Sequence, residues 1–208
     1  MNTGRITIRT VAVVLVCAVA AASRQASAQE PTPAPATAAD AAKDYARMMQ
    51  SAKPAEAIRA YWDMDAMLGA IFGEQFNKHT DAERGEIRRL LMGFVETVYA
   101  NPDIAQAMKQ SKFEDFKTTE NASRGLTVVT FNVRIQDKVI PNSLQMKQVD
   151  GRWRIQDAGA NGKMIVPSIR ADYEPKAQRV TPLEYVKSMV AQSGDKGPGE
   201  KKSADKTK

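Results

Sequence analysis

The sequence predicts an α+β domain in which helices pack on one face of a curved antiparallel sheet of about four strands. Apolar side chains recur every three to four positions through residues 40–112, which is the spacing of amphipathic helices. From residue 113 to residue 157 apolar and polar side chains alternate, which is the spacing of strands. A helical pattern returns near residue 181. Helices, a meander and a last helix in this order are typical of the α+β class.

Before the sheet, five helices are predicted from their start signals and apolar spacing. The start signals, in chain order, are Asp40, Pro54, Asp63, the capping-box pair Thr80 and Glu83, and the pair Asn101-Pro102. Each signal precedes an apolar stripe, and the stripe after Thr80 is the longest. These helices need a partner surface because each has one apolar face.

The meander is expected to comprise residues 113–120, 128–135, 139–149 and 152–157. Tight turns at residues 136–138 and at Asp150-Gly151 connect the last three strands. Thr181, Pro182 and Glu184 then start the final helix. A sheet curved in this way leaves a concave face that side chains or a ligand must fill.

The chain begins with a predicted secretory signal peptide. Arg5 and Arg9 precede an apolar run at residues 11–22, and Ala26-Ser27-Ala28 matches a cleavage pattern. The run is too short to cross a bilayer, which takes about 20 residues. We therefore expect cleavage after Ala28 and a periplasmic protein.

Four regions are expected along the chain: the signal peptide at 1–28, a Pro/Ala-rich linker at 29–39, one domain at 40–192 and a disordered Lys-rich tail at 193–208. The one cysteine lies in the first region, so the mature chain would hold no disulfide. The signal peptide also holds three of the 30 basic residues and no acid. The mature chain then has 27 basic and 24 acidic residues, and this net charge of +3 does not favour a nucleic-acid partner.

Catalytic chemistry has little support in the sequence. His79 is the only histidine, and we expect it to be exposed in a loop, with no triad, metal site or cofactor around it. Asp157 is the best acid candidate, because Trp153 and Ile155 on the same predicted strand face would raise its pKa. The structural alternatives for Asp157 are hydrogen bonds to loop amides or an ion pair with an arginine.

Apolar side chains are abundant, by contrast, and include ten methionines. Methionine is flexible and suits surfaces that adapt to variable ligands. Composition alone does not distinguish such a surface from a solid core, and both interpretations stay open.

The order of these elements resembles the MlaC/toluene-tolerance family of periplasmic phospholipid-binding proteins, which work with an ABC transporter. The resemblance rests on residues 61–100, similar to the family's aromatic-Asp, Leu-Gly, Thr-x-x-x-Arg and terminal Tyr pattern, on residues 150–157 (DGRWRIQD), and on Arg170. It spans about residues 40–190. Gly162-Lys163-Met164 and residues 167–170 depart from the usual Gly-Val-Ser and Asn-Tyr-Arg of the family.

The resemblance implies a nuclear-transport-factor-2-like fold with an apolar cavity that encloses acyl chains. The implied function is a non-enzymatic periplasmic carrier that shuttles a phospholipid between outer-membrane and inner-membrane complexes and so maintains outer-membrane lipid asymmetry. The implied partners are the lipid, an inner-membrane ABC transporter complex and an outer-membrane lipoprotein complex. A hopanoid or another isoprenoid is an alternative cargo. Two other functions remain: a small-substrate enzyme that uses a cavity carboxylate, and an envelope interaction module with a filled core.

Fourteen residues are candidates for lipid contact: Ile71, Leu91, Phe94, Val98, Val129, Phe131, Val133, Leu144, Met146, Trp153, Ile155, Met164, Val166 and Arg170. Trp153 and Ile155 are expected to floor the cavity, and residues 164–166 to form its mouth. Arg170 is expected either near a lipid phosphate or paired with Asp157, and the pairing is the favoured interpretation.

Overall fold

The structure, a computed structural model, describes residues 35–51 and 53–194. The predicted signal peptide, most of the predicted linker and the predicted tail from residue 195 lie outside these residues. Eight α-helices fall in the described ranges. They are α2 (Ala38–Gln50), α3 (Pro54–Tyr61), α4 (Met64–Phe72), α5 (Glu74–Asn77), α6 (Asp81–Tyr99), α7 (Pro102–Gln110), α8 (Ile165–Tyr173) and α9 (Pro182–Gly194).

The sheet has five described strands, joined consecutively as an antiparallel meander. They are β1 (Lys112–Asn121), β2 (Leu126–Ile135), β3 (Lys138–Val149), β4 (Arg152–Ala160) and β5 (Lys163–Met164). The α+β class and the meander are confirmed, and β5 is one strand more than expected. A turn at Asn161-Gly162, in which both residues have positive φ, joins β4 to β5.

Local capping explains where the helices begin. Asp63 accepts the backbone N–H of Ala66 at 3.0 Å, and Thr80 and Glu83 form the predicted capping box of α6. The prediction for Asp40 was wrong. Thr37 caps α2 instead, and Asp40 lies in the first turn, where its charge favours the positive end of the helix.

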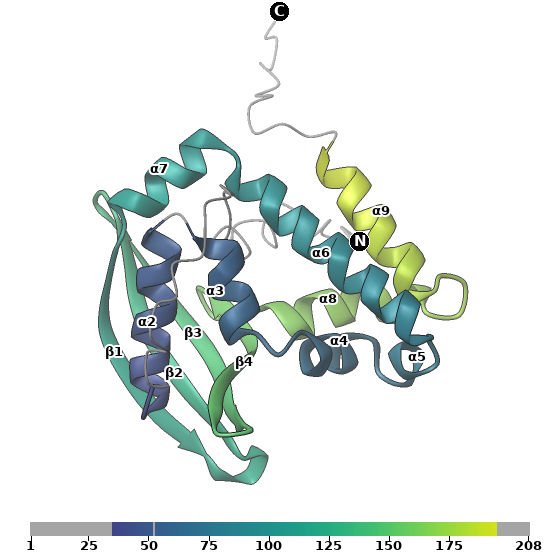
Figure 1. The fold of residues 1–208 in the computed structure, drawn as a ribbon, viewed down its shortest axis with the longest axis horizontal. Helices are drawn as coiled ribbons and strands as arrows, with labels where there is room; N and C mark the ends of the chain where they lie inside the picture. The colour runs from purple at the N-terminus through teal and green to yellow at the C-terminus, as the bar shows by residue number, and fades with distance from the viewer. Residues whose placement is uncertain (1–34, 52, 195–208) are drawn as a thin grey trace, which may run out of the picture.

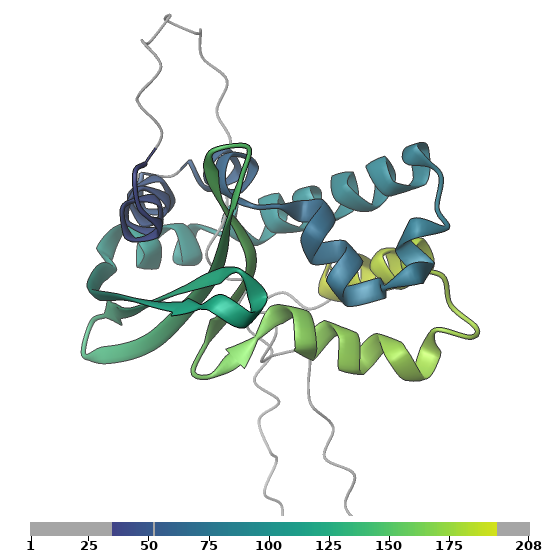
Figure 2. The same ribbon diagram turned by 90° about the horizontal axis from the view of Figure 1, so that it is seen from below.

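The helices form two groups beside the sheet (Figure 1). Helices α2 and α3 lie on one face of the sheet, whereas α4, α5, α6, α8 and α9 gather to one side of it. Figure 2 shows the same division from below, with α8 running from the end of the sheet into the second group. Each group has its own hydrophobic cluster. One joins α2, α3, α7 and the second half of α6 to the inner face of the sheet, and the other joins α4, α5, the first half of α6, α8 and α9.

The segment between α3 and α4 links the two clusters. Trp62 and Met64 pack against both of them. Trp62 also forms a parallel bridge with Ile155 of β4, and the N–H of Asp63 donates to the carbonyl of Ile155 at 2.9 Å. This segment therefore fixes the second cluster to the sheet.

Helix α8 was not predicted. The apolar run at residues 164–166, expected to form the mouth of the cavity, supplies the N-cap Met164 and the first two residues of this helix, and Pro167 lies in its first turn. Proline is tolerated there because a first-turn N–H has no partner within the helix. Gly159 permits the approach of β5, since a Cβ at that position would lie 2.5 Å from both the carbonyl oxygen of Lys163 and the sulfur of Met164.

Candidate functional site

A cavity lies where the two hydrophobic clusters meet. Its walls come from α2, α3, α4, α6, α8, α9 and the inner face of the sheet. Its volume is about 110 Å³, measured as the space that the centre of a water molecule can reach.

The wall is built from apolar side chains on both sides. The helical side comprises Tyr45, Met49, Ile58, Trp62, Met64, Met67, Leu68, Ile71, Phe72, Leu91, Met92, Phe94, Val95, Ile165, Ile169, Tyr185, Val186 and Met189. The sheet side comprises Phe113, Phe131, Val133, Asn142, Leu144, Ala158 and Gly159. None of these described wall residues is Asp, Glu, His, Lys or Arg, so the wall has no charged side chain.

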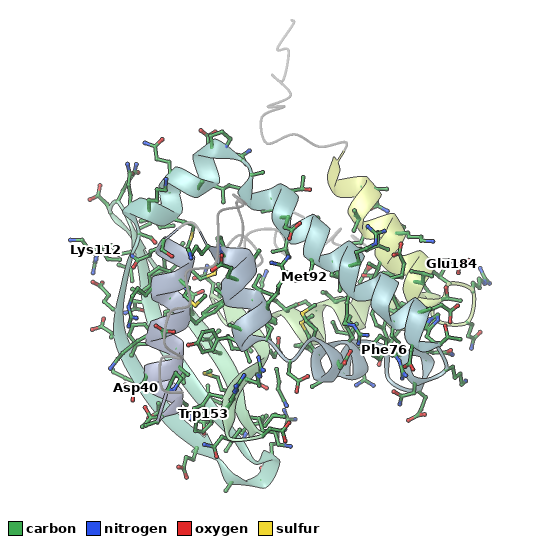
Figure 3. All side chains as sticks on the ribbon, viewed as in Figure 1. Asp40, Phe76, Met92, Lys112, Trp153 and Glu184 are labelled. Carbon is green, nitrogen blue, oxygen red and sulfur yellow. The ribbon has the colours of Figure 1, made fainter. Side chains whose placement is uncertain are left out.

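Methionines supply much of the helical wall. Five of them contact the cavity: Met49, Met64, Met67, Met92 and Met189. Figure 3 shows Met92 on α6, in the region between α6 and α3. Unbranched thioether side chains adopt several rotamers at low cost, so this wall can change shape around a guest.

Aromatic rings support the sheet side. Phe131 stacks on Phe116 with ring centroids 5.0 Å apart and on Phe113 with centroids 5.9 Å apart. Phe113 and Phe131 line the cavity. This stack makes the wall at β1 and β2 stiff, because each ring is held by its neighbour.

The tyrosine and tryptophan heteroatoms of the wall have protein partners. The Tyr45 hydroxyl accepts the indole N–H of Trp62 at 3.3 Å, and the Tyr185 hydroxyl donates to Asp172 at 2.8 Å. Burial, and then the hydrogen bond to Asp172, raise the pKa of Tyr185 well above its ordinary value. Both rings therefore present mainly hydrocarbon to the cavity.

Asp157 lies beside the cavity and not on its wall. Its Oδ1 accepts the backbone N–H groups of Ala158 at 2.8 Å and of Val166 at 3.0 Å. Burial raises the pKa of Asp157, and the backbone hydrogen bonds partly oppose this. The expected pair with Arg170 is wrong, because Arg170 is exposed and its Nε donates to Glu174 at 2.7 Å. The alternative, hydrogen bonds to backbone amides, is confirmed, but these amides belong to β4 and to the first turn of α8 and not to a loop.

A β-bulge explains the orientation of Asp157. Gln145 and Met146 are adjacent on β3, yet they pair with Asp157 and Ile155, so β4 has one extra residue here. Adjacent strand residues point to opposite faces, and therefore Asp157 and Ile155 do as well. The expectation that they share a face was wrong for this reason.

Six of the fourteen candidate residues line the cavity: Ile71, Leu91, Phe94, Phe131, Val133 and Leu144. The other eight lie elsewhere: Val98, Val129, Met146, Trp153, Ile155, Met164, Val166 and Arg170. Val129, Met146 and Ile155 are fully buried in the first cluster under α2 and α3. Neither Trp153 nor Ile155 floors the cavity, because Trp153 pairs with Gln148 near the far hairpin and Ile155 lies under Trp62.

Several wall residues were not among the candidates. Tyr45 and Met49 belong to the predicted apolar face of the first helix, and Val186 and Met189 to that of the last helix. Their apolar spacing identifies these faces, but it does not show that they border one common space. Ile169 had no usable signal, because α8 itself was not predicted.

Two titratable side chains near helix starts make contacts with neighbouring residues. The side chain of His79 is only 11% exposed, with Nδ1 lying 3.3 Å from Glu83, so the exposed-loop prediction was wrong. Asp65, in the first turn of α4, forms an ion pair with Arg88 and so joins α4 to α6. Within the described ranges no cluster of three or more His, Cys, Asp or Glu side chains could hold a metal.

One further ion pair spans the cavity region. Arg59 of α3 and Glu96 of α6 approach to 2.8 Å, and both side chains are largely exposed. Their sequence neighbours Ile58 and Val95 line the cavity. The pair therefore connects the helices of the two groups outside the apolar wall.

No described helix is both long and apolar enough to cross a membrane. No protein-family model matches the chain, and no curated protein matches it either. Among solved structures, the chain is similar to a phospholipid-binding protein from Ralstonia solanacearum in complex with a phospholipid. The two are 12% identical, the match covers 78% of this chain and 99% of that chain, and the TM-score is 0.61. The likeness shows a shared fold.

Proposed function

We propose that the protein is a periplasmic lipid carrier. Its cavity encloses the acyl chains of a phospholipid or a related lipid, and the protein moves this lipid between outer-membrane and inner-membrane transport complexes. The result would be maintenance of outer-membrane lipid asymmetry. The partners in this proposal are an inner-membrane ABC transporter complex and an outer-membrane lipoprotein complex.

The observation that carries the proposal is a cavity whose wall has no charged side chain, at the junction of two clusters. Burial of hydrocarbon stabilises a complex by about 0.8 kcal/mol for each CH₂ group, so an apolar cavity can compete with a membrane for acyl chains. Support also comes from the fold, which this chain shares with a protein solved with a bound phospholipid. Net affinity is much smaller than the gross gain, because the membrane already shelters the chains.

A narrow cavity requires movement for loading. The cavity lies where the two clusters meet, so we expect loading to displace the wall helices of one cluster from those of the other. Flexible methionines on the helical wall then allow the side chains to repack around a chain. We expect loading and release to be slow unless a partner complex favours the open form.

The two alternative functions have less support. The enzyme hypothesis requires a carboxylate exposed in the cavity, whereas Asp157 is buried, is held by backbone amides and lies off the wall. The filled-core hypothesis requires a solid interior, whereas the two clusters enclose free space.

The decisive experiment is mass spectrometry of the mature protein, residues 29–208, purified from a periplasm without detergent. Native spectra report the mass of any bound molecule, and organic extracts identify it. We expect one lipid per protein at near-stoichiometric occupancy. A clean ligand-free mass that persists after incubation with phospholipid vesicles would reject the proposal.

The transport step needs its own test. Cells lacking the protein should accumulate phospholipid in the outer leaflet of the outer membrane, detected by an outer-leaflet acylation assay. Restoration by the wild-type gene, and not by a variant with a filled cavity, would connect the phenotype to lipid binding. Unchanged outer-leaflet phospholipid would limit the function to lipid storage.

A further inference from the structure

One side chain of the cavity wall differs from the rest. Among the described wall residues Asn142 alone has an amide side chain, and it lies on β3 between Phe131 of β2 and Ala160 of β4. It is half-buried. Its cross-strand neighbours are apolar, and Phe131 belongs to the aromatic stack. A polar group therefore interrupts an otherwise hydrocarbon wall.

The hydrogen bonds of Asn142 are incomplete. Its Nδ2 donates to the backbone carbonyl of Ile140 at 2.8 Å, and this contact fixes the orientation of the amide, since the reverse would place two oxygens together. An amide has a second N–H and an oxygen with two lone pairs. Oδ1 of Asn142 accepts no hydrogen bond from any described residue. One donor and one acceptor therefore remain for a guest.

The unpaired acceptor determines which guest fits. Asn142 also borders a second pocket with Thr130, Asn132 and Ser143, so its amide lies between apolar and polar side chains. A pure hydrocarbon chain pairs with neither remaining group of the amide, which makes it a less favourable guest than a polar one. An ester carbonyl can accept from the second N–H but has no proton for Oδ1. A hydroxyl group can donate to Oδ1 and can also accept from the N–H.

We propose that Asn142 is a specificity-determining residue of the cavity and that it selects lipids with a hydroxyl group on an otherwise hydrocarbon chain. The inference rests on the proposed function, because it requires a lipid chain to enter the cavity. It goes further in assigning one residue and one functional group. The preference for hydroxylated chains arises because a hydroxyl group can donate a hydrogen bond to Oδ1 of Asn142. The apolar side chains of the wall do not distinguish a hydroxylated chain from a plain hydrocarbon chain.

The test uses three ligands of similar length: dodecane, 1-dodecanol and methyl undecanoate. Each displaces the apolar fluorophore N-phenyl-1-naphthylamine from delipidated protein, below the solubility limit of the ligand. The variants are Asn142→Leu, which keeps side-chain volume, and Asn142→Ala as a second substitution. Asn132→Leu is the matched control, because Asn132 on β2 lies off the cavity wall and its Nδ2 donates to Asp115. Thermal unfolding shows that each variant is folded.

We expect Asn142→Leu to weaken 1-dodecanol binding about tenfold, equivalent to about 1.4 kcal/mol. Dodecane should bind with unchanged or higher affinity, and the loss for methyl undecanoate should be smaller than for 1-dodecanol. Asn132→Leu should alter none of the three. If all ligands bind and Asn142→Leu changes them equally or not at all, the inference is overturned and the carrier proposal stands. If the wild-type protein binds none of the ligands or the fluorophore, both fail.

Discussion

The Asp157 carboxylate on β4 accepts the backbone N–H of Val166 in the first turn of α8 at 3.0 Å. Helix α8 has no side-chain cap of its own, because Met164 occupies the N-cap position. A neighbouring strand therefore supplies the cap. Since Ile165 and Ile169 of the same helix line the cavity, Asp157 positions part of the wall without contacting the cavity itself.

Replacing this cap should destabilise the protein. We expect Asp157→Ala to lower the free energy of unfolding by about 1–3 kcal/mol, because two backbone N–H groups lose their acceptor. Urea denaturation measures the change. Asp137→Ala, at an exposed turn between β2 and β3, should have little effect. Equal stability of both variants would show that α8 does not depend on this cap.

The buried Asp157 also predicts a pH dependence. Burial raises its pKa in the folded state above the ordinary value of 3.8, so the folded protein binds this proton more tightly than the unfolded chain does. The stabilisation is therefore fully present below pH 3.8 and is lost as the pH rises through the raised pKa. We expect the stability of the wild type relative to Asp157→Asn to fall over that range. A difference that stays constant from acid to neutral pH would contradict the assignment.

Filling the cavity should reduce lipid binding without unfolding the protein. Ala158 lines the cavity from β4 and is half-buried, so Ala158→Leu adds carbon atoms to free space. A bound chain then meets an overpacked site, and we expect a loss of about 2 kcal/mol, or roughly thirtyfold in affinity. Titration with a fluorescent lipid measures it. Ala171→Leu, on the exposed side of α8, is the matched control and should bind normally.

Helix starts and strand faces were predicted correctly where they depend on residues that are close in sequence. Thr80 with Glu83, Asp63 and Asn101 were predicted correctly as helix starts, because a cap depends on side chains within three residues. Strand alternation predicted the inner positions Phe131 and Val133, because the face on which a strand side chain lies also depends on its immediate neighbours. The Asn161-Gly162 pair is a local hairpin signal as well, and it marks the turn into β5.

The predictions that were wrong concern features that depend on contacts between distant parts of the sequence. The bulge in β4 depends on pairing with β3, so no periodicity within β4 alone would have separated Ile155 from Asp157. The cap of α8 comes from another strand, which is why the helix start at Ile165 has no local signal. The position of the cavity depends on how two clusters meet, and this explains why buried Val129 was not distinguished from wall residue Leu144.

The Arg59–Glu96 ion pair leads to a prediction about exchange. It is exposed, so its contribution to stability should be small, at about 0–1 kcal/mol. In a chain starting at residue 29, Arg59→Cys with Glu96→Cys provides the only two thiols. We expect a bismaleimide cross-link between them to slow lipid exchange with vesicles at least about tenfold, because α3 and α6 can no longer separate.

The control for this cross-link stays within one helix. Glu86→Cys with Arg89→Cys replaces another ion pair, three residues apart on α6, by the same chemistry. Cross-linking this pair should leave exchange unchanged. Equal rates for free and cross-linked 59/96 protein would show that lipids enter by a route that does not separate these helices.

The two tryptophans of the chain have different surroundings, so their fluorescence should respond differently to a bound lipid. Trp62 lines the cavity at the junction of the clusters, whereas Trp153 lies away from it. Hydrocarbon entering the cavity contacts the indole of Trp62 and does not reach that of Trp153. The emission of Trp62 should therefore change over a constant background from Trp153, so that occupancy can be followed in real time in the unlabelled protein.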